Sequence, residues 1–433
     1  MAEAAAWSDA LERLVGVLSS FYSAAGRQRA LRYVRGLLAP VERKNGWQLA
    51  EAAGDASPAA MQDFLARTRW DADAVRDDLQ AYVIEQLSDD AAVLVLDETG
   101  FVKKGDCSVG VKRQYSGTAG RIENCQIGVF LGSASRRGRV RVDRALYLPE
   151  EGAGTDERRR AVGIPSTVDF ATKPKLGRAM LERAVAAGLP CRWVAADSVY
   201  GGDDALRLWL ERQPLGSVLA VTSKQRAPMG FDTVKERAAG VAAADWQRLS
   251  AGDGAKGPRL YDWAHKTYAS LRDGWCRGLL VRRSIAEPDK LTYSLTFAPE
   301  GTPVATLVRV AGSRWTIESC LEAAKGEVGL DQYEVRSWTG WHRHVTLAML
   351  ALAFLTVVRT AAIGAEEHLD LAADLLPLTV PEIRTLLAAL VGLPPAPPTA
   401  VIAWSIWRRR HQQRARRSHW KRRTQIDSDR LSY

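Results

Sequence analysis

Two short apolar segments that each end at an aspartate constrain the fold of this chain most. AAVLVLD (91–97) and RWVAAD (192–197) have the length and composition of buried strands, with Asp97 and Asp197 as their last residues. Strand-like and helix-like segments alternate around them, which predicts an α/β sheet covered by helices. Ligands of such sheets bind beyond the strand ends, so the two aspartates are candidate site residues. Taken singly, each is more often a helix cap or a turn residue.

A helix predicted to begin near residue 302 supplies a third acid. At 100° per residue, Arg314, Glu318 and Lys325 fall within about 40° of one another. Glu322 lies on the margin of this stripe and Glu327 on the other side of the helix. The ordinary interpretation is a solvated ion pair between Arg314 and Glu318. The functional interpretation is a charged stripe that borders a site.

Asp97, Asp197 and Glu318 would together form a site with only oxygen ligands. Such a site suits Mg2+, with Mn2+ as a substitute. Two ions can activate the attacking oxygen and stabilise the leaving oxygen of a phosphodiester, and Arg314 and Lys325 would hold the phosphate beside them. We expect no ligand role for Glu98, Glu322 or Glu327, which serve as controls.

Other site chemistries lack their residues. The chain has six histidines and no H-E-x-x-H, which disfavours a zinc hydrolase, and no Walker-type phosphate loop, which disfavours ATP-driven chemistry. The five cysteines lie far apart, as expected in a reducing compartment. The longest apolar run, 345–358, is too short to span a bilayer and predicts a buried helix. We therefore expect a soluble, cytoplasmic protein with no membrane partner.

The positive charge is concentrated near the C-terminus. Residues 408–423 carry nine basic side chains and no acid, and so account for most of the formal net charge of +10. Such a segment usually binds a polyanion, although a solvated tail is the simpler alternative. The interleaved Trp404, Trp407 and Trp420 predict stacking beside phosphate contacts. The candidate phosphate-binding residues are Arg408, Arg409, Arg410, Arg414, Arg416, Arg417, Lys421, Arg422 and Arg423.

The first 85 residues show helical periodicity and no strand-like run. Segments 46–54 and 59–68 predict two helices joined by a short turn. They could form a DNA-binding helix-turn-helix or a plain helical hairpin, and the residues do not decide between the two.

Three blocks of the sequence carry a resemblance to a known family. They are LDETGFVKKGDCSVGVKRQYSGTAGRIENCQ (96–126), AADSVYGG (195–202) and RVAGSRWTIESCLEAAKGEVGLDQYEVRSWTGW (309–341). In this order they resemble the bacterial insertion-sequence transposases of the DDE type, in the branch with a Tyr-Arg-Glu-Lys signature. The resemblance covers about residues 30–425. Arg314, Glu318 and Lys325 match the signature, whereas Ala311 stands in its tyrosine position.

The resemblance implies a fold and a division of the chain. The fold class would be α/β, an RNase H-like mixed sheet with flanking helices, interrupted by a β-rich insertion and preceded by an N-terminal helical domain. The implied parts are a helical, DNA-binding domain (1–85), the catalytic domain (86–223 and 302–365), the insertion (224–301), and a C-terminal helical region with the basic tail (366–433).

The resemblance also implies an activity. Asp97, Asp197 and Glu318 would hold two Mg2+ ions and cut double-stranded DNA at the terminal inverted repeats of an element. The freed 3′-hydroxyls would then join target DNA, in many members after a DNA hairpin stage. The implied partners are these DNAs and a second copy of the chain in the DNA complex, in the bacterial nucleoid. An aromatic side chain would stack on an unstacked base, with Trp315 the best candidate and Trp263 and Trp275 weaker ones. For each of them a buried core position is the commoner explanation.

Two other functions remain open. One is a domesticated, transposase-derived DNA-binding protein or regulator without strand transfer, against which the intact acids argue. The other is a metal-dependent DNA nuclease that cuts without joining, which only a strand-transfer assay would distinguish.

Overall fold

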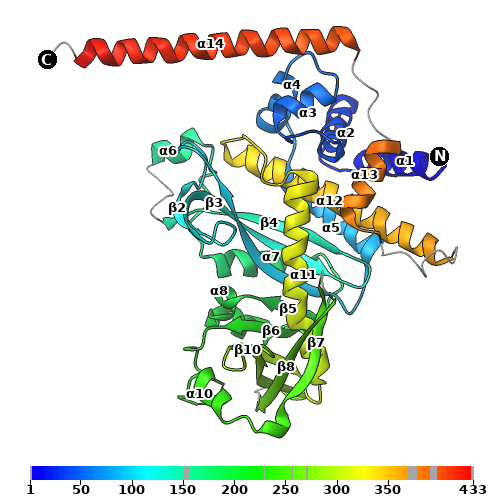
Figure 1. Cartoon of the computed structure of the whole chain (residues 1–433), viewed down its shortest axis with the longest axis vertical. Helices are drawn as coiled ribbons and strands as arrows, with labels where there is room; N and C mark the ends of the chain where they lie inside the picture. Colours follow the sequence, from blue (N-terminus) through cyan, green and yellow to red (C-terminus); the bar gives the residue numbers. More distant parts are fainter. Residues whose placement is uncertain are drawn as a thin grey trace.

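The strands form one mixed sheet whose centre has the RNase H-like order. The computed structural model describes residues 2–150, 156–228, 230–254, 257–269, 272–368, 378–390 and 397–430 (Figure 1). In the centre of the sheet, β3 (Arg121–Ala134) pairs antiparallel with β4 (Arg139–Tyr147) and with β1 (Val93–Val102). The short strands β5 (Trp193–Ala196) and β6 (Gly216–Val221) continue it in parallel. The predicted fold class is confirmed.

The insertion does not form a separate sheet. Its strand β10 (Leu291–Pro299) pairs antiparallel with β6, so the catalytic sheet continues through it. The remaining strands, in the order in which they extend the sheet, are β9 (Trp275–Arg283), β8 (Gly257–Tyr268) and β7 (Gln247–Gly254). The small helix α10 (Val234–Ala239) packs on these strands.

Helices cover both faces of the sheet. On one face lie α5 (Ala72–Leu87), α11 (Val304–Val328) and α12 (Trp338–His368). On the other face lies α7 (Lys173–Ala186), followed along the chain by α8 (Ser198–Gly201) and α9 (Asp204–Leu210). A short helix, α6 (Asp156–Ala161), precedes α7. Figure 1 shows α11 running across the middle strands toward the insertion.

The predicted buried helix is confirmed as the central part of α12. Its side chains from Leu347 to Leu355 are almost fully buried between β4, α5 and the N-terminal helices. By length and composition alone, Trp338–Gly364 could cross a membrane, but 61% of its most apolar window is buried inside this protein. Its hydropathy is therefore explained by the core that it forms.

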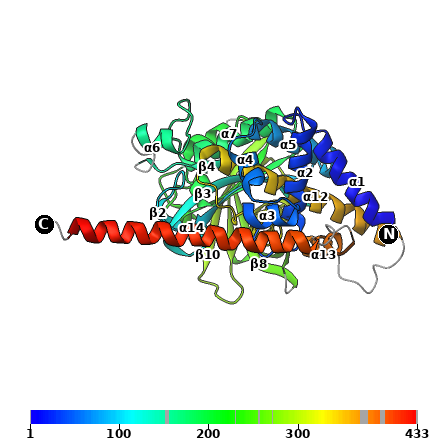
Figure 2. The same cartoon turned by 90° about the horizontal axis from the view of Figure 1, so that it is seen from above.

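The first helices are α1 (Ala2–Gly16), α2 (Ala24–Leu38), α3 (Gly46–Ala52) and α4 (Ala59–Ala66). Of these, α2 and α4 pack directly on α12, whereas α1 and α3 pack on α2. Phe64 of α4 is buried, and Tyr33 of α2 shares a hydrogen bond of 2.7 Å with His344 of α12. Two C-terminal helices follow, α13 (Val380–Leu390) and α14 (Pro398–Arg430), and α14 extends well past the body of the protein (Figure 2).

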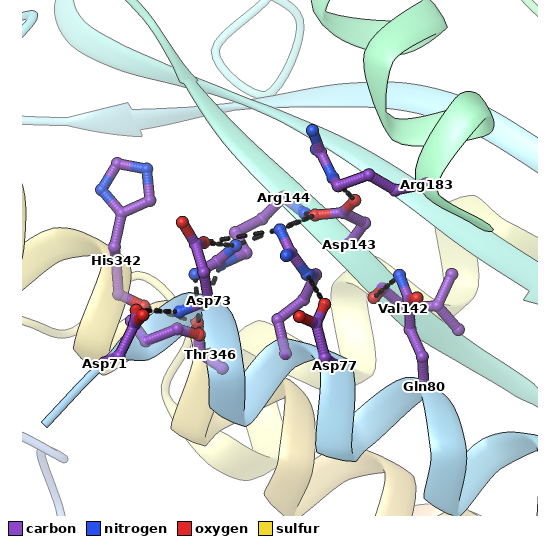
Figure 3. A network of polar contacts seen from close by, with 12 residues as sticks. Asp71, Asp73, Asp77, Gln80, Val142, Asp143, Arg144, Arg183, His342 and Thr346 are labelled. Atoms are coloured by element: carbon purple, nitrogen blue, oxygen red, sulfur yellow. Dashed lines mark hydrogen bonds and ion pairs between the residues drawn. The ribbon is translucent and has the colours of Figure 1, made fainter. Parts of the chain in front are cut away.

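A buried ionic network joins α5, β4, α7 and α12 (Figure 3). Asp143 has no exposed side-chain surface, and its carboxylate accepts a hydrogen bond of 2.9 Å from Arg183 of α7. Arg144 donates to Thr346 of α12 at 2.8 Å and to Asp73 of α5 at 2.8 Å. Arg76 lies 3.6 Å from the same Asp143 carboxylate. Because Asp143, Arg76 and Arg144 are all buried, each of these three charges depends on its partners.

We expect Asp143→Asn to lower the free energy of unfolding by about 3–5 kcal/mol, because it removes the fully buried counter-charge from Arg76 and Arg144. Urea denaturation would measure the change. The matched control is Asp77→Asn, since Asp77 pairs with Arg76 but is 63% exposed. This control substitution should lower the free energy of unfolding by no more than about 1 kcal/mol. Equal losses in the two variants would contradict this account of the network.

Candidate active site

The pairing of β1 with β5 sets Asp97 beside Asp197. The two strands are parallel, with Leu96 opposite Ala196, so the next residue on each chain is an aspartate. The expectation that Asp97 ends its strand was wrong, because β1 continues to Val102. Its hydrogen-bonding partner β3 is longer than β5 and supports this extension. Asp197 does follow the last residue of β5.

Asp197 also caps a helix, which is the simpler role that its position suggested. It is the N-cap of α8, and its Oδ1 accepts a hydrogen bond of 2.9 Å from the backbone N–H of Val199. The helix then packs so closely on β6 that a Cβ on Gly201 would lie 1.9 Å from the carbonyl oxygen of Ala220. Capping fixes the direction of the carboxylate and uses only one of its oxygens in this bond, so a cap and a ligand are compatible here.

Helix α11 brings Glu318 to the same region. It contacts β1 and β5, and both Asp197 and Glu318 lie close enough to raise the pKa of Asp97 by repulsion. The carboxylate of Glu318 is 45% exposed and forms an ion pair with Arg314 one turn earlier, as the ordinary interpretation expected. Within the described residues, no three acidic, histidine or cysteine side chains stand in ready-made metal-binding geometry. The acids are neighbours, and Glu318 is turned toward its arginine.

The three control acids pair with other side chains or face solvent. Glu98 follows Asp97 on β1, so it points to the opposite face, where it pairs with Lys173 and accepts a hydrogen bond of 2.8 Å from the Tyr200 hydroxyl. Glu327 pairs with Arg384 of α13. Glu322 is exposed one turn beyond Glu318.

Arg141 of β4 lies at this candidate site, although no pattern in the sequence predicted it. Its guanidinium is fully buried, lies 3.9 Å from Asp97 Oδ2, and donates a hydrogen bond of 2.9 Å to the carbonyl of Ile317. Its Nε and Nη1 find no hydrogen-bond partner in the described chain, although the Cys320 thiol lies beside them. The only sequence signal was an arginine within a strand of alternating valines. Arg141 ties β1 to the helix turn that carries the third acid.

The electrostatics of the site fit a bound cation. Burial raises the pKa of Asp97 to about 6; Arg141 opposes this rise, and Asp197 and Glu318 add to it. Burial and the nearby Glu98 also raise the pKa of Asp197. Carboxyl groups that repel one another in a partly dry site become stable as anions when a cation joins them. The chemistry of these oxygen donors therefore suits a hard divalent metal ion.

The two basic signature residues differ in position. Arg314 borders a cavity of about 280 Å3 that is also lined by Asp197, Trp315 and Ala311. The small side chain in the tyrosine position of the signature therefore leaves open space at the site. Lys325 instead donates to the carbonyl of Gly100 at 3.4 Å and to the Thr118 hydroxyl at 3.1 Å.

The candidate stacking tryptophans are all in contact with other side chains. Trp315 lies parallel to Tyr261 with 5.9 Å between ring centroids, and the Arg282 guanidinium is 4.8 Å from the Trp315 ring. Trp263 is buried. Trp275 stacks on Phe297 at 4.9 Å. Trp315 is thus the one that stands both on the site helix and at the cavity wall.

The basic tail is the long helix α14, anchored at its beginning on α3. Trp404 is buried and donates a hydrogen bond of 2.7 Å to the carbonyl of Asp55, while Trp407 meets the edge of Trp47 at 4.7 Å. The expectation that Trp404 stacks beside phosphates was wrong, because its ring is buried in the core of the protein. Trp407 is half-buried, and its stacking stays a prediction. Arg408 forms two hydrogen bonds, of 2.8 and 2.7 Å, with Glu51.

The other tail candidates lie beyond this anchor. Trp420 is 66% exposed. The exposed basic side chains are Arg409, Arg410, Arg414, Arg416, Arg417 and Lys421. The side chains of Arg422 and Arg423 fall outside the described residues.

We expect Mn2+ to raise the melting temperature, because a ligand of the folded state stabilises it by mass action. Free Mn2+ at one hundred times its dissociation constant would add about 2.7 kcal/mol. The shift should be larger at pH 7.5 than at pH 5.5, since below a pKa of about 6 the metal competes with a proton on Asp97. Differential scanning fluorimetry should show that the Mn2+-induced shift in melting temperature is reduced in Asp97→Asn and is kept in Glu322→Gln. An undiminished shift in Asp97→Asn would exclude this carboxylate as a ligand.

Comparisons with known proteins identify a family and a relative that this chain resembles. A family model described as DDE superfamily endonuclease matches residues 16–251, which include Asp97 and Asp197 but not Glu318. A probable transposase for the insertion sequence element IS701 from Microchaete diplosiphon is 26% identical over 178 residues, which are 40% of this chain and 43% of the relative. Endonucleases of this superfamily act on DNA and generally use divalent metal ions. Since the family match spans more than half of its length, the chain belongs to the DDE superfamily endonucleases.

Proposed function

We propose that this protein is a cut-and-paste DNA transposase whose acids are Asp97, Asp197 and Glu318. The observation that carries the proposal is the parallel register of β1 and β5, which makes two aspartates neighbours beneath a helix with a third acid. The similarity to a probable insertion-sequence transposase supports it. The chain matches 43% of the length of that relative.

Two Mg2+ ions between these carboxylates would supply the activation of the attacking oxygen and the stabilisation of the leaving oxygen. The protein's own part is to hold the donors. Asp197 is fixed by its capping bond, and Asp97 by burial and by Arg141. Glu318 would have to leave Arg314, and the released guanidinium would then face the cavity beside Asp197, where it could hold a phosphate.

Trp315 is the residue we propose for stacking on an unstacked base. It lies at the cavity beside Ala311, and Tyr261 and Arg282 already hold its ring in place. A preformed ring loses little conformational freedom on binding. If Trp315→Ala unfolded the protein instead of slowing end processing, the structural role alone would remain.

The partners in this proposal are the terminal inverted repeats of an element and a target DNA, with a homodimer formed on the DNA in the bacterial nucleoid. Helix α14 would bind phosphates through its exposed cations. A nuclease without joining activity, or a silent regulator, would bind the same DNA. A strand-transfer assay separates them, because only a transposase joins a 3′-hydroxyl to a second duplex.

We expect Glu318→Gln to keep DNA binding and to abolish both nicking and strand transfer, because it keeps the shape of the side chain and removes the charge that a metal needs. Gel assays with Mg2+ and supercoiled plasmid would measure both reactions. Glu322→Gln is the matched control, one turn away on the same helix and exposed, and it should remain active. An active Glu318→Gln with an inactive Glu322→Gln would move the third ligand by one helical turn.

We expect replacement of the exposed tail arginines by glutamine to weaken binding to duplexes of any sequence. The slope of log affinity against log salt should fall by about 0.9 for each phosphate that the helix no longer neutralises. The variant changes Arg409, Arg410, Arg414, Arg416 and Arg417 and leaves the anchor intact. Fluorescence anisotropy at several salt concentrations would measure the slope, and lysine at the same positions should preserve it. An unchanged slope in the glutamine variant would show that α14 binds no phosphate.

A further inference from the structure

The hairpin of β2 (Lys112–Ser116) and the beginning of β3 exposes an apolar pair that the function proposed above does not use. Tyr115 and Ile122 stand directly opposite each other in the antiparallel register. Their side chains are 64% and 60% exposed, among the most exposed large apolar residues of the described chain. Paired residues of this kind stabilise a hairpin by packing together, and they also present one continuous apolar surface to solvent.

The hairpin tip is fixed beside the candidate acids. The Thr118 hydroxyl lies 3.1 Å from the hydroxyl of Thr99, two residues after Asp97 on β1. Lys325 of the site helix donates to the same Thr118 hydroxyl at 3.1 Å. These bonds tie the turn of the hairpin to both β1 and α11.

The strand next to the turn is fixed as well. Ser116 is fully buried against β1, where a Cβ on Gly100 would lie 2.2 Å from its hydroxyl. Tyr115 precedes this serine, so its backbone cannot move away from the site without disrupting that packing. The backbone that carries the exposed pair is therefore held against β1. Because Ser116 faces β1, the neighbouring Tyr115 and its partner Ile122 lie on the outward face of the hairpin.

The charge around the pair favours a polyanion. Residues 101–126 contain five lysines and arginines but only two acids. Arg113 is exposed two residues before Tyr115 on β2, which places both side chains on the same face of the strand. A stable protein partner would need a much larger apolar surface than two side chains. One ring with a cation on the same strand face instead matches a nucleic acid base beside its phosphate.

We propose that Tyr115, supported by Ile122, stacks on a base of the DNA next to the phosphodiester held at Asp97, Asp197 and Glu318, while Arg113 contacts a neighbouring phosphate. The occupant of the hairpin is thus the substrate DNA. This inference rests on the proposed function and adds a second contact point, on the strand side of the site opposite to Trp315 and the insertion.

The test is binding of the full-length protein to a mixed-sequence 30-bp duplex with one nick, which represents DNA cut on one strand. One base beside the nick is 2-aminopurine, whose fluorescence reports stacking. Without divalent metal, Tyr115→Ala should weaken binding by about 5- to 150-fold, the range that corresponds to one stacked base, and should remove the fluorescence change. Tyr115→Phe keeps the ring and should retain both signals. Phe231→Ala is the matched control, because Phe231 is an aromatic residue that is 90% exposed in the insertion.

The outcomes are distinct. If the wild-type protein binds and nicks DNA while Tyr115→Ala behaves like it, the hairpin proposal is wrong and the proposed function stands. If Tyr115→Phe loses as much DNA affinity as Tyr115→Ala, the hydroxyl and not the ring is responsible for binding, and stacking is excluded. If the wild-type protein binds no DNA, the proposed function fails first. Circular dichroism of each variant would confirm that these exposed substitutions leave the fold intact.

Discussion

The parallel pairing of β1 and β5 is the constraint on which the site depends. Asp97 and Asp197 are 100 residues apart in the chain, and only this register makes them neighbours. A shift of one residue would turn one carboxylate to the other face of the sheet. The close approach of α8 to β6 at Gly201 supports the register, because it fixes the chain directly after the second aspartate. Mutations at this glycine should therefore disturb chemistry and folding together.

Arg141 shows how the site carries its own charge balance. A buried guanidinium beside Asp97 offsets part of the repulsion among the acids while no metal is bound. The same guanidinium donates a hydrogen bond to the carbonyl of Ile317 on α11, so the charge balance among the acids depends on the position of this helix. A cation in the site would thus be expected to compete with Arg141 for Asp97 and with Arg314 for Glu318.

Local pattern predicted much of this arrangement. The buried apolar strands that carry the two aspartates, the helical stripe of Arg314 and Glu318, and the buried α12 all follow from periodicity, which is a property of short segments. The features that local pattern could not predict are nonlocal. The continuation of β1 past Asp97 depends on its partner β3, the burial of Trp404 depends on α3, and the role of Arg141 depends on a helix 176 residues away. A search of short segments could not predict these three features, because each depends on a partner that lies far along the chain.

The junction of β10 with β6 has a mechanical consequence. Five residue pairs, from Tyr293 with Val221 to Phe297 with Ser217, join the insertion to the catalytic strands by backbone hydrogen bonds. The insertion therefore cannot swing over the site as a lid, since any hinge would have to break this ladder. Trp263 and Arg282 of the insertion line the same cavity as Asp197, and this ladder joins the two parts of the wall. When a stiff duplex meets this fixed shape, it is the nucleic acid that has to deform, and sequences that bend or unstack easily should be accommodated at the lowest cost.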